Sequence, residues 1–306
     1  MPNDPLFPEQ WGLKEINAEK AWDLCNGNAD KVILAVLDSG IAVEAGKLSH
    51  PDLNDADRFF LGRDLINHDD DPSDDHGHGT HVTGIASATR NNKTGIAGLW
   101  LGQVLVIKVF DSKNNGSSET FKDGITAAVR FAKERSSHLV INYSGGGPDS
   151  NLKKTAVQYA VENGALLVAA AGNNDGGVID YPAAYASEYS QVMAVGAVDS
   201  ERKRPSFASR GPQMSVVAPG VDILSTLPNY YTTVNQAEKK QTKYDRLQGT
   251  SQAAPLVSAL AALIWSKWPD LPAAQVREKI TASADPITGS SEDFGHGMIN
   301  AEKALT

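Results

Sequence analysis

Four polar residues of the 306-residue chain could together carry out nucleophilic catalysis. The first, Ser251, lies in QGTSQAAPLVSALAALIWSKW, residues 248–268, where Gly-Thr-Ser opens a long apolar run. A helix that begins here, with Pro255 in its first turn, directs free backbone N–H groups and its positive dipole end toward the serine hydroxyl. This environment suits an oxygen that becomes negatively charged, although an ordinary N-capping serine would explain the same stretch.

Three residues elsewhere in the chain could support such a serine. Asp38 ends the apolar run KVILAVLD, Asn173 follows ALLVAAAG, and His78 lies in DDHGHGTHVTGIAS, residues 74–87. Serine catalysis needs a base that removes the hydroxyl proton, a carboxylate that orients the base, and donors for the oxyanion. His78, Asp38 and Asn173 have this chemistry. Taken singly, Asp38 also fits a turn-forming aspartate, and Asn173 fits an ordinary loop asparagine.

The histidines of this segment allow a second interpretation. His76, His78 and His81 fall within six residues, as the ligands of a metal ion could. However, no HExxH pair or cysteine accompanies them, and small residues surround them. We therefore expect a catalytic His78 and structural roles for His76 and His81.

The elements that position these residues follow from the pattern of apolar runs. Most of six runs rich in Val, Ile, Leu and Ala lack polar alternation, which is typical of parallel strands covered on both faces. Amphipathic stretches lie between them, including residues 120–136, 151–164 and 270–283. This order predicts an α/β fold with a parallel sheet, whose ligands bind beyond the carboxyl ends of the strands. The six runs are residues 31–38, 104–110, 138–144, 165–172, 192–198 and 215–220.

Composition limits the classes of partner. Asp and Glu number 37 against 28 Lys and Arg, and the net charge of −9 argues against nucleic-acid and anionic-membrane partners. No apolar run is long enough to span a membrane, and no stretch resembles a linker. We expect one domain over residues 1–306 without nucleic-acid or membrane partners. The acidic residues cluster at positions 69–71 and 74–75, which fits cation binding.

Four blocks of this chain resemble the signatures of subtilisin-like serine proteases, the subtilases, and most of all the thermitase-like bacterial enzymes. They are VLDSG at 36–40, HGTHVTG at 78–84, AAGN at 170–173 and GTSQAAP at 249–255. The resemblance covers nearly the whole chain. It implies a three-layer sandwich with a seven-stranded, mostly parallel sheet, and a serine endopeptidase that cleaves extended polypeptides through an acyl-enzyme.

The same resemblance assigns roles to the four residues. Ser251 would be the nucleophile, His78 the general base and Asp38 the carboxylate that orients it. Asn173 and the backbone N–H of Ser251 would bind the oxyanion. A catalytically silent binding module and a transpeptidase are the alternatives. A silent module is expected to have lost one of the four residues, and all four are present.

The resemblance further implies a substrate site formed by Ser144, Gly145, Gly146, Ala170 and Gly172. The segment around Ser144 would pair with an extended peptide by β-augmentation. Asp180 stands where the family commonly has a small or neutral residue on the floor of the pocket for P1, the residue before the scissile bond. A carboxylate there would favour Lys or Arg at P1, and a solvated loop aspartate is the equal alternative. Gln252 replaces the usual Met after the nucleophile, which predicts tolerance to peroxide.

Calcium is the cofactor that the resemblance implies, as a structural ion. Oxygen-rich turns suit Ca²⁺, which takes six to eight oxygen ligands. A second calcium site is the weaker prediction, because two family ligands are substituted there and a solvated acidic loop explains it equally well. The first site would use Asp4, Asp52, Thr89, Asn92, Thr94 and Ile96, and the second Asp64, Asn67, Asp69 and Asp71.

The remaining expectations concern processing and partners. The stretch MPNDPLFPEQWG has no signal-peptide pattern. The family is usually made with a pro-segment that blocks the cleft, so we expect a processed form, with a pro-segment or a protein inhibitor as cleft partner. We expect a secreted monomer, with an intracellular subtilase as the alternative. Residues 229–246 form a segment that is longer than usual, and we expect a polar surface loop near the leaving-group side of the cleft.

Overall fold

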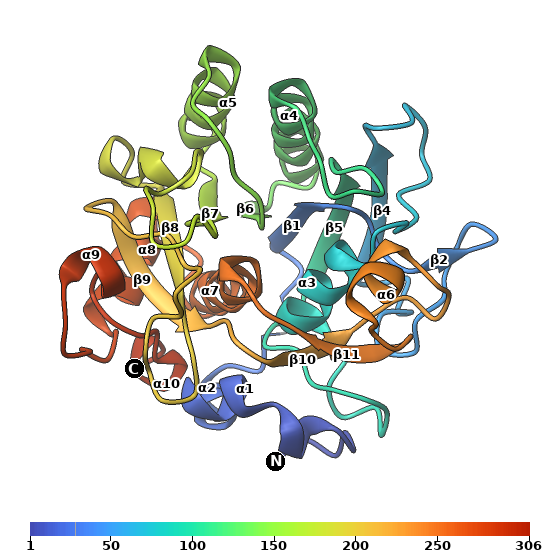
Figure 1. Ribbon diagram of the computed structural model, residues 1–306, viewed down its shortest axis with the longest axis horizontal. Helices are drawn as coiled ribbons and strands as arrows, with labels where there is room; N and C mark the ends of the chain where they lie inside the picture. The colour runs from blue at the N-terminus through green and yellow to red at the C-terminus, as the bar shows by residue number, and fades with distance from the viewer. Residues whose placement is uncertain (28) are drawn as a thin grey trace.

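The apolar runs form the strands of one parallel sheet at the centre of the molecule (Figure 1). The computed structural model describes residues 1–27 and 29–306. The sheet has seven strands, and every pair of neighbours in it is parallel. In spatial order they are β4 (Phe59–Asp64), β5 (Gln103–Lys108), β1 (Val32–Asp38), β6 (His138–Tyr143), β7 (Leu166–Ala170), β8 (Val192–Val198) and β9 (Met214–Pro219).

All six predicted runs are strands, which confirms the α/β prediction. The seventh strand, β4, was expected only from the family resemblance. It lies at the edge of the sheet, where only its two end residues are buried and the four between them are partly or fully exposed, so its sequence lacks a continuous apolar run. Two small antiparallel ladders lie outside the sheet. They join β2 (Val43–Glu44) to β3 (Lys47–Leu48) and β10 (Ile223–Thr226) to β11 (Tyr244–Leu247).

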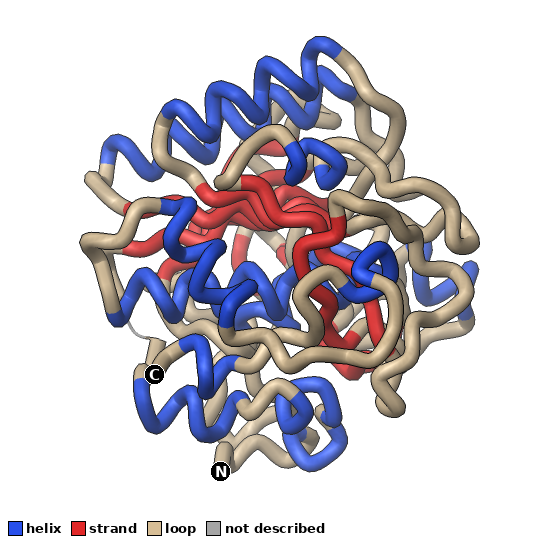
Figure 2. The backbone as a smooth tube through the Cα atoms, turned by 90° about the vertical axis from the view of Figure 1, so that its left-hand side faces the viewer, coloured by secondary structure: helices blue, strands red, loops and turns tan. Residues whose placement is uncertain are grey.

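Helices cover both faces of the sheet, and Figure 2 shows the strands between them from the side. Helices α4 (Ser118–Glu134) and α5 (Asn151–Glu162) pack side by side on one face with η2 (Ala183–Ser187). Within residues 1–27 and 29–306, no helix is long and apolar enough to cross a membrane. The other face carries α1 (Trp11–Glu15), α2 (Ala18–Leu24), α3 (His78–Ser87), α7 (Thr250–Lys267), α8 (Ala273–Ala282) and α10 (Ala301–Ala304). Shorter helices are η1 (Phe7–Glu9), α6 (Thr233–Glu238) and α9 (Ser291–Phe294).

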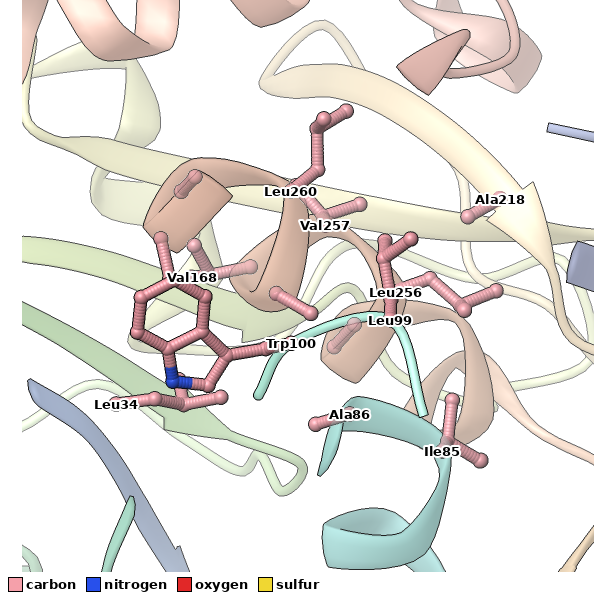
Figure 3. Packing of buried hydrophobic residues seen from close by; sticks show 14 of the residues in the cluster. Leu34, Ile85, Ala86, Leu99, Trp100, Val168, Ala218, Leu256, Val257 and Leu260 are labelled. Carbon is pink, nitrogen blue, oxygen red and sulfur yellow. The ribbon is translucent and has the colours of Figure 1, made fainter. Parts of the chain in front are cut away.

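Helix α7 is the buried centre of its layer. Its residues are apolar on all sides, because it packs against α3 and against five strands at once. Figure 3 shows Leu256 and Leu260 of this helix in the core that also holds Trp100. The indole Nε1 of Trp100 donates to the carbonyl of Gln103 (3.2 Å), so its polar atom is satisfied. This packing fixes the start of α7, where Ser251 lies, relative to the sheet.

The segment 229–246 is more ordered than predicted. Half of the segment, α6 and three residues of β11, is helix or strand where a loop was predicted, although many of its side chains are exposed. Thr232, Val234 and Asn235 are buried. Thr232 and Asn235 cap α6 reciprocally, and Val234 joins an apolar cluster with Leu227. These local contacts were not visible in a sequence judged by its polarity.

Candidate active site

The carboxyl ends of three neighbouring strands carry the predicted residues to one edge of the sheet. Strand β1 ends at Asp38, and β6 and β7 lie beside it in turn. Residues directly after β6 and β7 include Ser144 and Asn173. The loop after β1 leads to His78, the first residue of α3, and α7 places Ser251 in its first turn. This is the edge at which parallel sheets bind ligands.

Asp38 and His78 form a buried pair. The Nδ1 of His78 donates to Oδ1 of Asp38 at 2.7 Å, and the same oxygen accepts from the N–H of Ser39 at 2.8 Å. Asp38 is completely buried. Burial by itself would lower the pKa of His78, but the charge and the hydrogen bond of Asp38 outweigh it and raise that pKa above 6.5. The pair therefore holds an imidazole with its Nε2 free to act as a base.

The hydroxyl of Ser251 does not donate its hydrogen bond to His78, the partner expected of a catalytic serine. Its Oγ donates to the carbonyl of Ser144 (3.0 Å), and no hydrogen bond joins it to His78 in the described chain. Ser144 returns a bond from its own Oγ to the carbonyl of Ser251 (2.9 Å). The two serines thus tie the first turn of α7 to the end of β6. The hydroxyl of Ser251 must give up this bond to the Ser144 carbonyl before it can donate to the imidazole, and such catalytic bonds often form only with substrate present.

Asn173 faces the start of α7 with a fixed amide. Its Oδ1 accepts from the backbone N–H of Thr250 (3.1 Å) and from the Thr250 hydroxyl (3.2 Å). The Nδ2 points toward Gly249 and would lie 3.2 Å from a Cβ added there. Gly249 has φ +153°, which a residue with a side chain rarely adopts, so both space and backbone require glycine. The amide N–H of Asn173 is thereby kept as a donor beside the N-terminus of α7.

Asp74, one of the acidic residues clustered at positions 69–71 and 74–75, has a structural role that its sequence position alone did not reveal. Asp74 is completely buried and anchors the start of α3. Burial would raise its pKa, but the hydrogen bonds it accepts outweigh burial and lower that pKa. In the sequence, this role could have been inferred only from the position of an aspartate a few residues before the start of a helix. The hydrogen bonds come from Ser39 Oγ (2.8 Å), His76 N (3.1 Å), Gly77 N (2.7 Å), Thr80 N (2.8 Å) and Thr80 Oγ1 (2.6 Å).

Lys108 is the second residue that sequence analysis missed. It is 1% exposed and pairs in register with Asp38 across strands β5 and β1. Its Nζ donates to the carbonyls of Ser39 (2.8 Å) and Ser73 (3.2 Å) and to the carboxylate of Asp75. The ammonium therefore joins the strand end that carries Asp38 to the loop that precedes His78. The sequence feature that could have identified Lys108 is a single charged residue inside the apolar run VLVIKVF.

The other two histidines of the segment lie near His78 but are buried differently. His81 is completely buried, and burial above all, with the nearby His78, lowers its pKa to about 3. Its neutral ring donates from Nε2 to the carbonyl of Asp245 (3.2 Å). Burial also lowers the pKa of His76. Among the residues that the structure describes, no group of three or more His, Cys, Asp or Glu is arranged to hold a metal ion.

Asp180 lies between the two segments predicted to bind substrate. Its Oδ2 is 2.7 Å from a Cβ added at Gly146 and 2.5 Å from one added at Gly172. Its Oδ1 accepts from Nδ2 of Asn174 (3.0 Å). The half-buried carboxylate thus lies between these two segments, and its role in a P1 pocket stays a prediction. Ala170 is the last residue of β7, and its side chain is buried in the core.

A family profile and individual relatives agree with this geometry. The profile of the subtilase family matches residues 29–297. The chain belongs to the subtilase family. This subtilase is 34% identical to thermitase of Thermoactinomyces vulgaris over 99% of each chain. It is 35% identical to the halolysin-like extracellular serine protease Nep of Natrialba magadii, over 100% of this chain and 53% of that protein.

A solved structure gives the same result for the fold. A protease from Pseudoalteromonas arctica PAMC 21717 matches this subtilase with a TM-score of 0.84 and 28% identity. The match covers 99% of this chain and 98% of that chain. The predicted three-layer fold and the family are confirmed, and the chain is a subtilisin-like serine protease, a hydrolase.

The residues predicted for a first calcium ion lie together in this subtilase. Asp4 accepts hydrogen bonds from the backbone N–H groups of Asn91 (2.8 Å) and Asn92 (3.1 Å). Asp52 accepts from Asn92 Nδ2 (2.8 Å), from the N–H of Ile96 (2.9 Å) and from the hydroxyl of Tyr244 (3.0 Å). Burial raises the pKa of Asp52, more than these bonds lower it, and Asp4 adds to the rise. The loop that contains Thr89 and Thr94 closes around the two carboxylates.

The residues predicted for a second calcium ion bind one another. Asp64 accepts from the backbone N–H of Ile66 (2.7 Å) and from both the backbone and the side-chain amide of Asn67 (2.9 and 2.8 Å). The N–H of Asp71 donates to Asp69 Oδ1 (2.9 Å). Both oxygens of Asp64 therefore hold its own turn. This second site stays a prediction.

Proposed function

We propose that this subtilase is an endopeptidase that hydrolyses peptide bonds of extended polypeptides with Asp38, His78 and Ser251 as its triad. One observation carries the proposal. The buried bond between Asp38 and His78 leaves Nε2 of the ring without a hydrogen-bond partner among the described residues, and α3, which begins at His78, packs against α7, whose first turn carries Ser251 and is bonded to Asn173. A buried imidazole bonded to a carboxylate, together with a serine at the N-terminus of a neighbouring helix, supplies the groups that nucleophilic serine catalysis requires.

The chemistry follows from the positions of these groups. Ser251 Oγ attacks the scissile carbonyl carbon while His78 Nε2 takes its proton, and Asp38 stabilises the resulting imidazolium. Nδ2 of Asn173 and the N–H of Ser251 donate to the developing oxyanion, which the positive end of α7 also favours. His78 then gives the proton to the leaving amine. A water molecule that His78 deprotonates hydrolyses the acyl-enzyme and frees Ser251.

We propose that the polypeptide binds along residues 144–146, with its P1 side chain beside Asp180. The half-buried carboxylate between Gly146 and Gly172 supports a preference for Lys or Arg at P1. Peptides that differ only at P1 test this, with Ser251→Ala and Asp180→Asn variants beside the native enzyme. We expect no cleavage by Ser251→Ala, and a preference for Arg over Leu that Asp180→Asn removes. Cleavage by Ser251→Ala would refute the triad, and an unchanged preference in Asp180→Asn would refute the pocket.

We propose one structural calcium ion between Asp4 and Asp52. The backbone carbonyls of Thr89, Thr94 and Ile96 accept no hydrogen bond from the described residues, so three oxygens stand ready beside two carboxylates. The amide of Asn92 must turn to present its oxygen, because its Nδ2 now donates to Asp52. Chelator should lower the unfolding temperature of a Ser251→Ala background but not that of the same background with Asp52→Asn. An equal response of both proteins would contradict this site.

We propose that the enzyme acts outside the cell. The support is its relative Nep, a halolysin-like extracellular serine protease. Fractionation of a culture of the native organism, followed with an antibody against this chain, tests the proposal. Recovery of the protein only from the cell interior would refute it.

A further inference from the structure

A cavity of about 260 Å³ lies beside the segment where we place the substrate. Residues 143–148 form one wall, and residues 114–118 form the other. The cavity begins at Ser144, which is hydrogen bonded to Ser251, and extends away from it toward Pro148. Its position is therefore on the side of the scissile bond where the amino-terminal part of the substrate would lie. The proposed catalytic groups do not use it.

Lys153 brings a buried positive charge to this cavity. The residue is 6% exposed and lines the cavity. Its Nζ donates to the carbonyl of Pro148 (2.9 Å) and would be 3.3 Å from a Cβ added at Gly147. In the part of the chain that the structure describes, no carboxylate lies within ion-pair distance of this ammonium. Two of its three N–H donors remain for a ligand.

The surroundings of Lys153 make its charge unfavourable in the free protein. Burial lowers its pKa, although the more distant Asp180 and Asp149 partly oppose this. Lys153 also stands in the first turn of α5, where the helix dipole disfavours a cation. Ser118 in the first turn of α4 also lines the cavity, so the positive N-terminal turns of both helices border the same space. An anionic group in the cavity would offset both the burial of the Lys153 ammonium and the unfavourable effect of the helix dipoles on it.

The reach of the chain along residues 144–147 indicates where such a group belongs in the substrate. These residues follow the end of β6 and belong to no strand, and an extended chain advances about 3.3 Å per residue, so Gly147 lies at most about 10 Å along the segment from Ser144. That distance corresponds to a substrate residue three or four positions before the scissile bond, P3 or P4. The cavity has room for one side chain of the size of Glu.

We propose that this enzyme selects substrates with an acidic side chain at P3 or P4, whose carboxylate binds the Lys153 ammonium. The inference rests on the proposed function, because the substrate strand defines the position of the cavity. It assigns a second charged specificity site in addition to the Asp180 pocket. The two sites have opposite charge, so the preferred sequence would combine an acidic residue with a basic P1.

Matched peptide pairs test this inference. Each pair carries Glu or Gln at one of P2, P3, P4 or P5, with the rest of the sequence and the P1 residue unchanged. For the native enzyme we expect kcat/KM to be on the order of tenfold higher for Glu than for Gln at P3 or P4, the size of one buried charge-assisted hydrogen bond. The ratio should be near one at P2 and P5, because those side chains do not reach the ammonium.

Variants at two neighbouring lysines separate this site from general charge effects. Lys153→Met should bring the Glu-to-Gln ratio close to one, and Lys153→Arg should keep it above one. Lys154→Met is the control, because Lys154 is half exposed and paired with Glu188 (2.6 Å), and this variant should keep the native ratio.

The outcomes separate this inference from the proposed function. Native enzyme that cleaves the Gln peptides without preferring Glu at any position would overturn the Lys153 inference alone. This result needs no variant, so a Lys153→Met protein that fails to fold would not weaken the test. A ratio that survives in Lys153→Met would also overturn the inference. If native enzyme cleaves no peptide of either kind, the proposed endopeptidase function and this inference fail together.

Discussion

The buried carboxylate of Asp74 provides the sharpest test of how this fold holds its catalytic histidine. Asp74 accepts five hydrogen bonds, three from backbone N–H groups and two from hydroxyls. Asp74→Asn keeps the shape but presents an NH₂ group to some of these donors. A buried donor left unsatisfied costs about 1–3 kcal/mol, and each charge-assisted bond contributes about 1.5–3 kcal/mol. We expect the free energy of unfolding to fall by about 3–5 kcal/mol.

Urea unfolding in a Ser251→Ala background measures this loss without self-digestion. Asp70→Asn is the matched control, because its side chain is 88% exposed and we expect little change. In the active background, Asp74→Asn should also lower kcat/KM, since Asp74 anchors the first turn of α3 where His78 lies. A loss below about 1 kcal/mol in Asp74→Asn would refute the reasoning.

The pH dependence of this effect has a definite sign. The pKa of Asp74 is lowered in the folded protein from its ordinary value of 3.8. Its contribution is therefore complete above pH 3.8 and is lost as the pH falls toward the folded-state pKa. The difference in stability between the Ser251→Ala parent and the Asp74→Asn variant should be constant near neutral pH and should narrow only below about pH 4.

Three further predictions follow from the site. Asn173→Ala should lower kcat by about 10²–10³ and change KM little. This size is carried over from the oxyanion asparagine of subtilisin. A loss of kcat below about tenfold in steady-state assays would contradict the role of Asn173. The acid limb of kcat/KM should lie above pH 6.5, because Asp38 raises the pKa of His78 and activity requires the neutral ring; a limb below 6.5 in a pH profile would contradict this. The native enzyme should keep its activity during peroxide treatment, whereas the Gln252→Met variant should lose its activity. Equal rates of inactivation of the two proteins would show that residue 252 does not determine the sensitivity to peroxide.

Much of the fold could be predicted because its signals are local. The six apolar runs, the amphipathic stretch 151–164 that forms α5 and the Gly-Thr-Ser start of α7 each depend on a few neighbouring residues. Gly164 has φ +75° just after α5 ends. The edge strand β4 carried a weaker signal, because solvent on one side interrupts its apolar pattern. The polar composition of the segment 229–246 was misleading, because some of its polar residues cap a helix by bonding to each other.

The sequence by itself determined the strand and helix order and the four residue types that the proposed chemistry requires. Only the tertiary structure decided how Ser251 bonds to Ser144, 107 residues away, and how Lys108 joins the strand of Asp38 to the loop before His78. It also decided that Lys153 lies in a cavity. Local patterns report backbone preference and the burial of one face. The partners of a buried charge depend on which distant segments the sheet brings to the same edge, and no short stretch of sequence records that.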